Sequence, residues 1–220
     1  MGNEFHTRRN YQSIKRSINN MDKTELLYDH YKETFSIIKE TIIQRNRFFI
    51  MVFFVITLQF LFATSPESIS SMIIGIVQNQ YEIDISNQMS IIQSFLWLIL
   101  LYLTMRYYQA TVYIERQYNC IYSIEADISS IEHIRFDRES GNYLSNYPKM
   151  SDFVDALYKW VFPIIYCMII CYKIVREYMT SKFNMLLVLN TILAISCFIL
   201  TILYLVFLHG KHNSNSSGNS

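Results

Sequence analysis

Charged residues are almost absent from four stretches of this chain, and glycine and proline are scarce throughout, with five and three copies in 220 residues. The charge-poor stretches are rich in Leu, Ile, Phe and Met. A bilayer core of about 30 Å takes roughly 20 such residues per helix, whereas a soluble domain of this size has little interior in which to bury four of them. Backbone amides in hydrocarbon must be satisfied within their own segment. The sequence therefore predicts an all-α membrane protein with four transmembrane helices, at residues 48–66, 85–105, 151–172 and 183–208.

Positive charge is missing from one connecting segment. No Lys or Arg lies between residues 65 and 85, whereas nine precede residue 48. Because positive residues are retained on the cytoplasmic side, we expect residues 1–47 in the cytoplasm and residues 67–84 as an external loop. With four spans, both termini are cytoplasmic. The apolar run 71–77 within that loop has two interpretations: it extends the first helix past a kink, or it lies in the outer interface.

The third span is the weakest of the four. Pro163 lies near the start of its apolar core, and Lys173, Arg176 and Lys182 crowd the short external loop expected over residues 173–182. Lys side chains near a helix end can extend to the interface, and a short helix can be met by local thinning of the bilayer. We expect four spans. The alternative keeps three spans and a re-entrant or interfacial helix.

Two segments outside the spans have amphipathic helical patterns. In residues 24–42, apolar side chains recur every three or four positions, and residues 106–135 repeat the pattern with isoleucine. The second stripe comprises Ile114, Tyr118, Ile121, Ile128 and Ile131. Since neither stripe can stay exposed, the segments are expected to pack as a cytoplasmic helical stalk or bundle, within one subunit or across several. We expect a homo-oligomer, with a tetramer favoured. Residues 136–150 form a loop, and residues 209–220 are too polar to fold alone.

Residues for catalysis or metal binding are not grouped in this sequence. The five histidines are scattered outside the spans, and the five glycines form no phosphate-binding loop. Cys167 and Cys171 share a helix face without partner ligands. The charge-free cores of the predicted spans, residues 48–66, 85–105, 160–172 and 183–208, hold no ionisable pair of the kind that membrane enzymes and coupled transporters use. We therefore expect no enzyme activity, catalytic residue, metal or cofactor.

Uncharged polar side chains do recur at helical spacing in two of the predicted spans. They are Gln93, Trp97 and Thr104 in the second span, and Asn190, Cys197 and Thr201 in the fourth. One interpretation is interhelical packing, in which small and hydrogen-bonding residues let membrane helices approach one another. The other is a pore lining, in which amides and hydroxyls replace part of an ion's hydration shell. A single four-helix subunit is too narrow for a pore, so this interpretation requires oligomerisation.

The N-terminal segment is basic. Arg8, Arg9, Lys15 and Arg16 accompany apolar residues that share one helical face. Such a segment can lie on the inner leaflet, bind an acidic protein partner or contact nucleic acid. Lipid contact is the default, because four charges give only weak, salt-sensitive affinity for nucleic acid unless several subunits combine.

The order of elements resembles that of small bacterial membrane proteins found as effectors or sensors in phage-defence operons. The likeness is one of architecture, strongest from Tyr113 to Pro163, and includes the loop at Tyr147-Pro148. It implies an oligomeric protein of the bacterial inner membrane that works with a separately encoded cytosolic partner. The leading hypothesis is therefore a gated ion-permeable pore. The alternative is a non-conducting membrane sensor or scaffold that recruits a soluble effector through its cytoplasmic helices.

Overall fold

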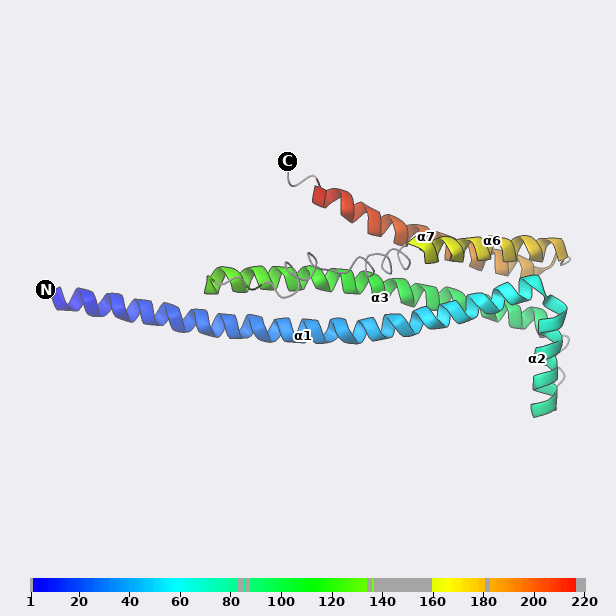
Figure 1. Ribbon diagram of the computed structural model, residues 1–220, viewed down its shortest axis with the longest axis horizontal. Coiled ribbons are helices and arrows are strands. Elements are labelled where there is room, and N and C mark those ends of the chain that lie inside the picture. Colours follow the sequence, from blue (N-terminus) through cyan, green and yellow to red (C-terminus); the bar gives the residue numbers. More distant parts are fainter. Residues whose placement is uncertain are drawn as a thin grey trace. The chain divides into compact units, whose positions relative to one another are not determined.

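The computed structural model is helical throughout the part of the chain that it describes (Figure 1). It describes residues 2–82, 85, 88–133, 136, 160–180 and 183–216, with side chains between residues 21 and 207 of these ranges. The helices are α1 (Gly2–Thr64), α2 (Pro66–Tyr81), α3 (Met89–Glu132), α6 (Phe162–Thr180) and α7 (Met185–Ser216). The predicted loop at 136–150, apart from Phe136, and the first part of the predicted third span lie outside the described residues.

The chain divides into two compact units. Unit 1 comprises residues 1–44 and 110–148, and unit 2 comprises residues 45–109 and 149–220. Within unit 1, the N-terminal part of α1 packs against the C-terminal part of α3. Tyr31 and Ile38 of α1 are buried with Ile114, Ile121 and Ile128 of α3. Each helix thus covers the apolar stripe of the other inside one subunit.

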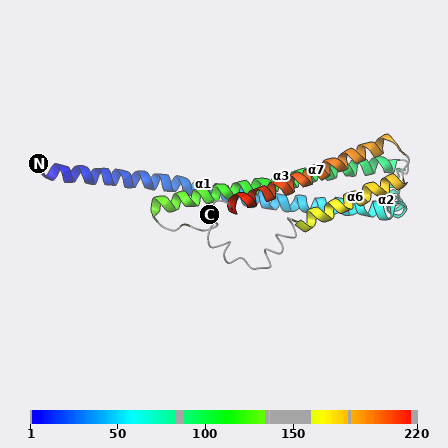
Figure 2. The same ribbon diagram turned by 90° about the horizontal axis from the view of Figure 1, so that it is seen from above.

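Unit 2 is a four-helix arrangement built from α6, α7 and the adjoining parts of α1 and α3 (Figure 2). Near the start of α6, the ring of Phe162 lies 4.8 Å from that of Phe49 and 6.0 Å from that of Tyr107. Near its end, Lys173 and Arg176 bond to Gln93 and Ala63. Helix α6 is therefore parallel to α1 and antiparallel to α3.

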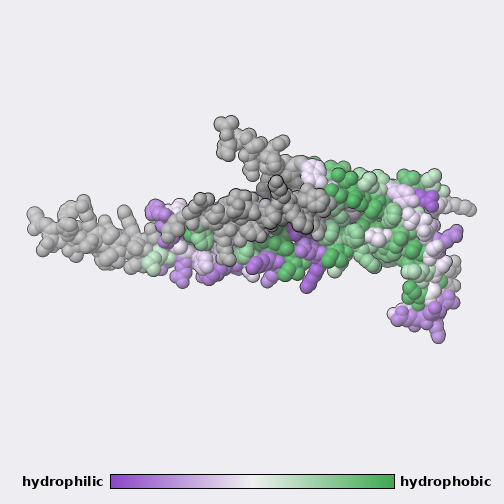
Figure 3. All heavy atoms as spheres, viewed as in Figure 1, coloured by the Kyte–Doolittle hydropathy of each residue, from purple (hydrophilic) through white to green (hydrophobic). Residues whose placement is uncertain are grey.

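Helix α7 completes this up-down-up-down order. Its Tyr204 stacks on Tyr108 of α3, with ring centroids 4.1 Å apart. At the other end of α7, Asn190 contacts Glu177 of α6. The interior between these two ends is filled by apolar and aromatic side chains, among which Trp97, Leu100 and Cys197 are fully buried. The outward-facing positions of the same helices are also apolar, as Figure 3 shows for the visible face of unit 2.

Most of residues 67–84, the predicted connection between the first two spans, form the helix α2. Ser65 ends α1, with its N–H bonded to Leu61 O at 2.9 Å, and Pro66 starts the next helix at its first position. Proline cannot continue α1 but is well suited to begin a helix, since its fixed φ is helical and its missing N–H is not needed there. Helix α2 ends where Glu82 adopts a left-handed conformation with φ 55°.

Three helical segments are long and apolar enough to cross a membrane: Met21–Thr64 of α1, Met89–Glu132 of α3 and Met185–Phe207 of α7. Helix α6 is not among them, because its second half holds Lys173, Arg176 and Glu177. These residues were expected in a short loop at 173–182, but α6 continues through Thr180. Helix α7 likewise continues through Ser216, into the segment 209–220 that was expected not to fold.

Candidate functional site

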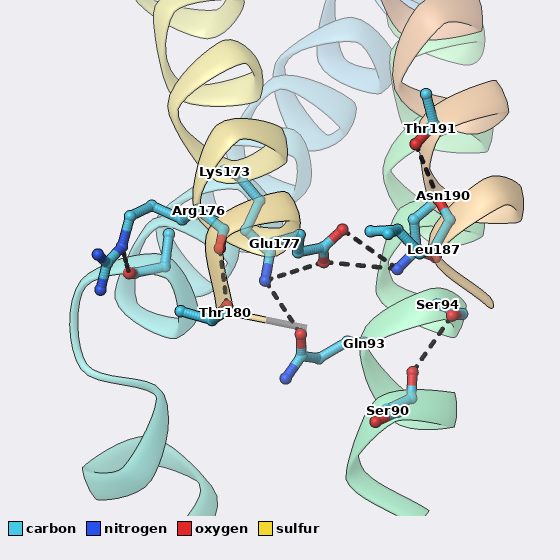
Figure 4. Close-up of polar contacts among 11 residues, drawn as sticks. Ser90, Gln93, Ser94, Lys173, Arg176, Glu177, Thr180, Leu187, Asn190 and Thr191 are labelled. Atoms are coloured by element: carbon cyan, nitrogen blue, oxygen red, sulfur yellow. Dashed lines mark hydrogen bonds and ion pairs between the residues drawn. The ribbon is translucent and has the colours of Figure 1, made fainter. Parts of the chain in front are cut away.

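A buried ion pair with polar neighbours lies inside unit 2. Lys173 Nζ is 3.1 Å from Glu177 Oε1, and the two side chains are only 3% and 8% exposed. Lys173 Nζ also donates to Gln93 Oε1 of α3 at 3.0 Å. Asn190 Nδ2 of α7 donates to both carboxylate oxygens of Glu177, each at 3.4 Å (Figure 4). Three helices thus meet through charged and amide groups, which we call the polar cluster: Gln93, Lys173, Glu177 and Asn190.

The register of α6 explains why these charges are buried. Tyr166, Ile170, Lys173 and Glu177 are spaced by four, three and four residues, so they lie on one helical face, and all four are buried. Helix stability alone does not favour this pair, since a Lys that precedes a Glu has the weaker of the two orientations. Its formation instead neutralises two charges that would each be costly to bury alone.

Two contacts place the polar cluster near the end of α1. Lys173 Nζ lies 6.0 Å from the centroid of the Phe62 ring, within reach of a cation–π attraction. Arg176 Nε donates to Ala63 O at 3.2 Å. The last carbonyls of a helix lack an N–H partner within the helix, and Ala63 O is one of these in α1. Arg176 therefore caps the C-terminal end of α1. The polar cluster therefore lies level with the end of the apolar run of α1, at Thr64.

Several buried polar atoms at and beside the polar cluster have no protein partner. They are Asn190 Oδ1, both amide atoms of Gln59 and Trp97 Nε1. Phe49 and Tyr107 mark one level of the antiparallel pair α1 and α3. Gln59 follows Phe49 by ten residues in α1, and Trp97 precedes Tyr107 by ten residues in α3. Because the two helices are antiparallel, Gln59 and Trp97 lie at a common level, about one helical turn from Gln93. Buried amides without partners are rare in folded proteins and require an explanation.

Hydroxyl groups continue this polar interior toward the aromatic end of the bundle. Thr104 Oγ1 and Tyr166 OH share a hydrogen bond of 2.7 Å between α3 and α6. Tyr108 OH donates to Thr201 Oγ1 of α7 at 3.1 Å. With the polar cluster, Gln59 and Trp97, these groups form successive polar levels inside the bundle, which we call the polar column.

All six polar residues proposed from the sequence for the spans lie in the interior of unit 2. Gln93 is half-buried, and the other five are buried: Trp97, Thr104, Asn190, Cys197 and Thr201. Gln93 and Asn190 bond to the two members of the ion pair, Lys173 and Glu177. Thr104 and Thr201 each bond to a different buried tyrosine, Tyr166 and Tyr108. They face other helices of their own subunit, which is the interhelical arrangement.

Sequence reasoning missed Lys173 and Glu177, which lie just beyond the predicted third span of residues 151–172 but belong to the same helix, α6. The two residues were placed in a loop because their charges end the apolar run. The usable signal was the spacing, since Lys173 and Glu177 continue the face set by Tyr166 and Ile170. Tyr166 and Tyr108 were also missed, because tyrosine in an apolar run is ordinarily an interfacial residue.

The isoleucine stripe expected to form an oligomer stalk is covered within the chain. Ile114, Ile121 and Ile128 are buried against α1 in unit 1. Tyr118 and Ile131 are partly buried. Thr24 Oγ1 also donates to Glu132 Oε1 across the same two helices at 2.8 Å. Of the two arrangements left open by the sequence, packing within one subunit is the one observed, because α1 and α3 supply matching apolar faces.

Truncation of Ile121 tests how strongly unit 1 depends on this packing. Ile121 is fully buried, so Ile121→Ala should cost about 2–5 kcal/mol of local stability through lost contacts and a residual cavity. Ile37→Ala, at a position of the same unit that is 37% exposed, should cost no more than about 0.5 kcal/mol. Hydrogen exchange of the amides in residues 24–42 measures the difference. Equal protection in both variants would contradict the packing described.

The basic residues of the N-terminal segment belong to α1. The side chains of Arg8, Arg9, Lys15 and Arg16 lie outside the described residues, although their backbone belongs to α1. Among the described residues, no group of three or more His, Cys, Asp or Glu side chains could hold a metal ion.

Comparisons with protein-family models, with curated proteins and with solved structures find no match for the chain.

Proposed function

We propose that the protein is an oligomeric effector of the bacterial inner membrane that opens a gated ion-permeable path, controlled by a cytosolic partner in an anti-phage defence system. The observation that carries the proposal is the polar column, with its buried Lys173–Glu177 ion pair and the unpartnered amide of Gln59. Gln59 lies within the apolar run of α1, and the ion pair lies level with the end of that run. Polar and ionisable groups inside a membrane bundle are costly, and they mark ion and proton pathways in membrane proteins. The architectural resemblance to phage-defence effectors supports the biological setting.

The proposal includes four spans with both termini in the cytoplasm. Helix α6 would be the third span. It contacts α1, α3 and α7 in unit 2, and its outward face is apolar at Ile164, Met168 and Val175. Pairing of Lys173 with Glu177 removes net charge from its inner face. The positive residues that precede residue 48, against none between 65 and 85, support the orientation.

The described conformation corresponds to a closed path in this proposal. Closely packed rings fill the bundle at one end, where Tyr107, Tyr108 and Tyr204 meet. The ion pair fills the other end. Opening requires the helices to separate, which neighbouring copies in an oligomer can support, with a tetramer favoured. Since α1 and α3 run from unit 1 into unit 2, a partner bound to unit 1 could move them.

Substitution of Gln59 tests whether its buried amide serves ion passage or only the stability of the bundle. Gln59 is fully buried and both amide atoms lack a protein partner, so Gln59→Leu should keep or raise thermal stability. If the amide serves ion passage, the same variant should lose at least about 90% of the K⁺ flux that wild-type protein supports in liposomes under an applied potential. The matched control is Thr57→Val on the outer face of α1, which should leave flux unchanged. Wild-type flux in a stable Gln59→Leu variant would contradict the proposed path.

A second candidate is the non-conducting sensor or scaffold. It is favoured by one observation: the polar residues of α3 and α7 face helices of their own subunit, while the outer faces of α3 and α7 are apolar. Deletion of residues 1–22 discriminates between the two functions. A scaffold that recruits its partner through the basic N-terminus would lose partner binding without any change in membrane conductance. A pore gated through the same segment would leak when it is removed.

A further inference from the structure

Helix α2 carries an apolar face that the described bundle leaves largely exposed. Ile69, Met72, Ile73 and Ile76 are spaced by three, one and three residues, so they share one side of the helix. None of the residues of α2 is buried, and Met72 and Ile76 are 58% and 53% exposed. The opposite side carries the polar residues Glu67, Ser71 and Gln78, together with Ile74.

The covalent connections of α2 place it at a membrane boundary if α1 and α3 cross the bilayer. A single residue, Ser65, joins it to the end of the apolar segment of α1, and Ile69 N donates to Ser65 O at 3.1 Å. Seven residues separate Tyr81 from the start of α3 at Met89. Both ends of α2 are thus tied to the ends of two apolar segments that are long enough to span.

We propose that α2 lies in the interface of the bilayer, with Ile69, Met72, Ile73 and Ile76 in the boundary between headgroups and acyl chains. An amphipathic helix with an apolar face of this width is stabilised there by burial of that face. The lipid it fits is zwitterionic, because residues 65–85 hold no Lys or Arg but include Glu67, Glu82 and Asp84. This inference requires only that α1 and α3 span the membrane, and it is independent of ion conduction.

The orientation of α2 can be measured with cysteine variants of the full chain in phosphatidylcholine liposomes. Met72→Cys and Ile76→Cys probe the apolar face, and Ser71→Cys and Gln78→Cys are matched positions on the polar face. A polar maleimide is added, and labelling at each introduced cysteine is read from its own peptide by mass spectrometry, so the four native cysteines can stay. All four positions are exposed, so the substitutions leave the bundle intact.

The expected result is labelling at least about tenfold slower at positions 72 and 76 than at 71 and 78, and this ratio should not rise when anionic phosphatidylglycerol is added. Equal rates on both faces would overturn the proposal, since they mean that α2 stands in water. Protection that disappears when the protein is diluted to one copy per liposome would also overturn it, because a second copy rather than lipid would then cover the face. A failure of conduction leaves this test unaffected.

Discussion

Replacing Glu177 with leucine should lower the thermal midpoint of the protein by roughly 10 °C, because it leaves the Lys173 ammonium buried without its counter-ion. Loss of one partner of a buried ion pair typically costs about 3–5 kcal/mol. The double variant Lys173→Met/Glu177→Leu should recover most of that loss, since an apolar pair of similar volume has no desolvation cost. Thermal unfolding of the detergent-purified protein, followed by far-UV circular dichroism, measures both effects.

The control for the Glu177 substitution is an exposed Lys–Asp pair in the same chain. Lys32 and Asp29 of unit 1 lie 3.9 Å apart but are 61% and 70% exposed. Exposed pairs contribute at most about 1 kcal/mol, so Asp29→Asn should leave the midpoint nearly unchanged. A double variant as unstable as Glu177→Leu alone would contradict the account, because it would show that the polar contacts of Lys173 and Glu177 stabilise the bundle directly.

Truncation of Trp97 should be the most destabilising single change in the interior of unit 2. Trp97 is 0% exposed, and Trp97→Ala should cost about 3–5 kcal/mol through the cavity it leaves among the four helices. This packing term persists in a bilayer, where the hydrophobic effect no longer drives helices together. Adjacent Leu98 is 43% exposed on the outer side of α3, so Leu98→Ala should have little effect. Resistance of the purified variants to heat and to limited proteolysis provides the measurement.

A second substitution at Trp97 tests whether its indole N–H contributes to stability. Its indole Nε1 has no protein partner, so Trp97→Phe should be tolerated far better than Trp97→Ala. If both substitutions were equally damaging, the indole N–H would be making a contact that the described packing does not contain.

The helical class and the apolar segments could be predicted from sequence, because length and charge depletion identify a membrane helix without any knowledge of its neighbours. The C-terminal end of α6 could not be predicted from charge depletion. Charge was taken as the end of the span, but Lys173 and Glu177 neutralise each other and contact Gln93 and Asn190 from distant parts of the chain. Such compensation depends on tertiary contacts.

The candidate site was predictable in part. The spacing of Asn190, Cys197 and Thr201 correctly indicated one face of a helix, and all three are buried. The same spacing could not decide whether that face meets another subunit or the same one. For the stripe at Ile114, Ile121 and Ile128, the deciding factor was the matching face of α1 around Tyr31 and Ile38, which covers it within the chain. The sequence indicated a helix at residues 71–77 only as one of two interpretations, because the serines and amides around them are also common in loops.

The central claim is that the buried polar column is a closed ion path. Planar-bilayer recordings of the purified wild-type chain and of the Lys173→Met/Glu177→Leu double variant test it most directly. The account predicts voltage-dependent single-channel steps in the wild-type protein and none in the double variant, which should be nearly as stable as wild type. Identical currents from both proteins, or no current from the wild-type protein with or without its cytosolic partner, would contradict it.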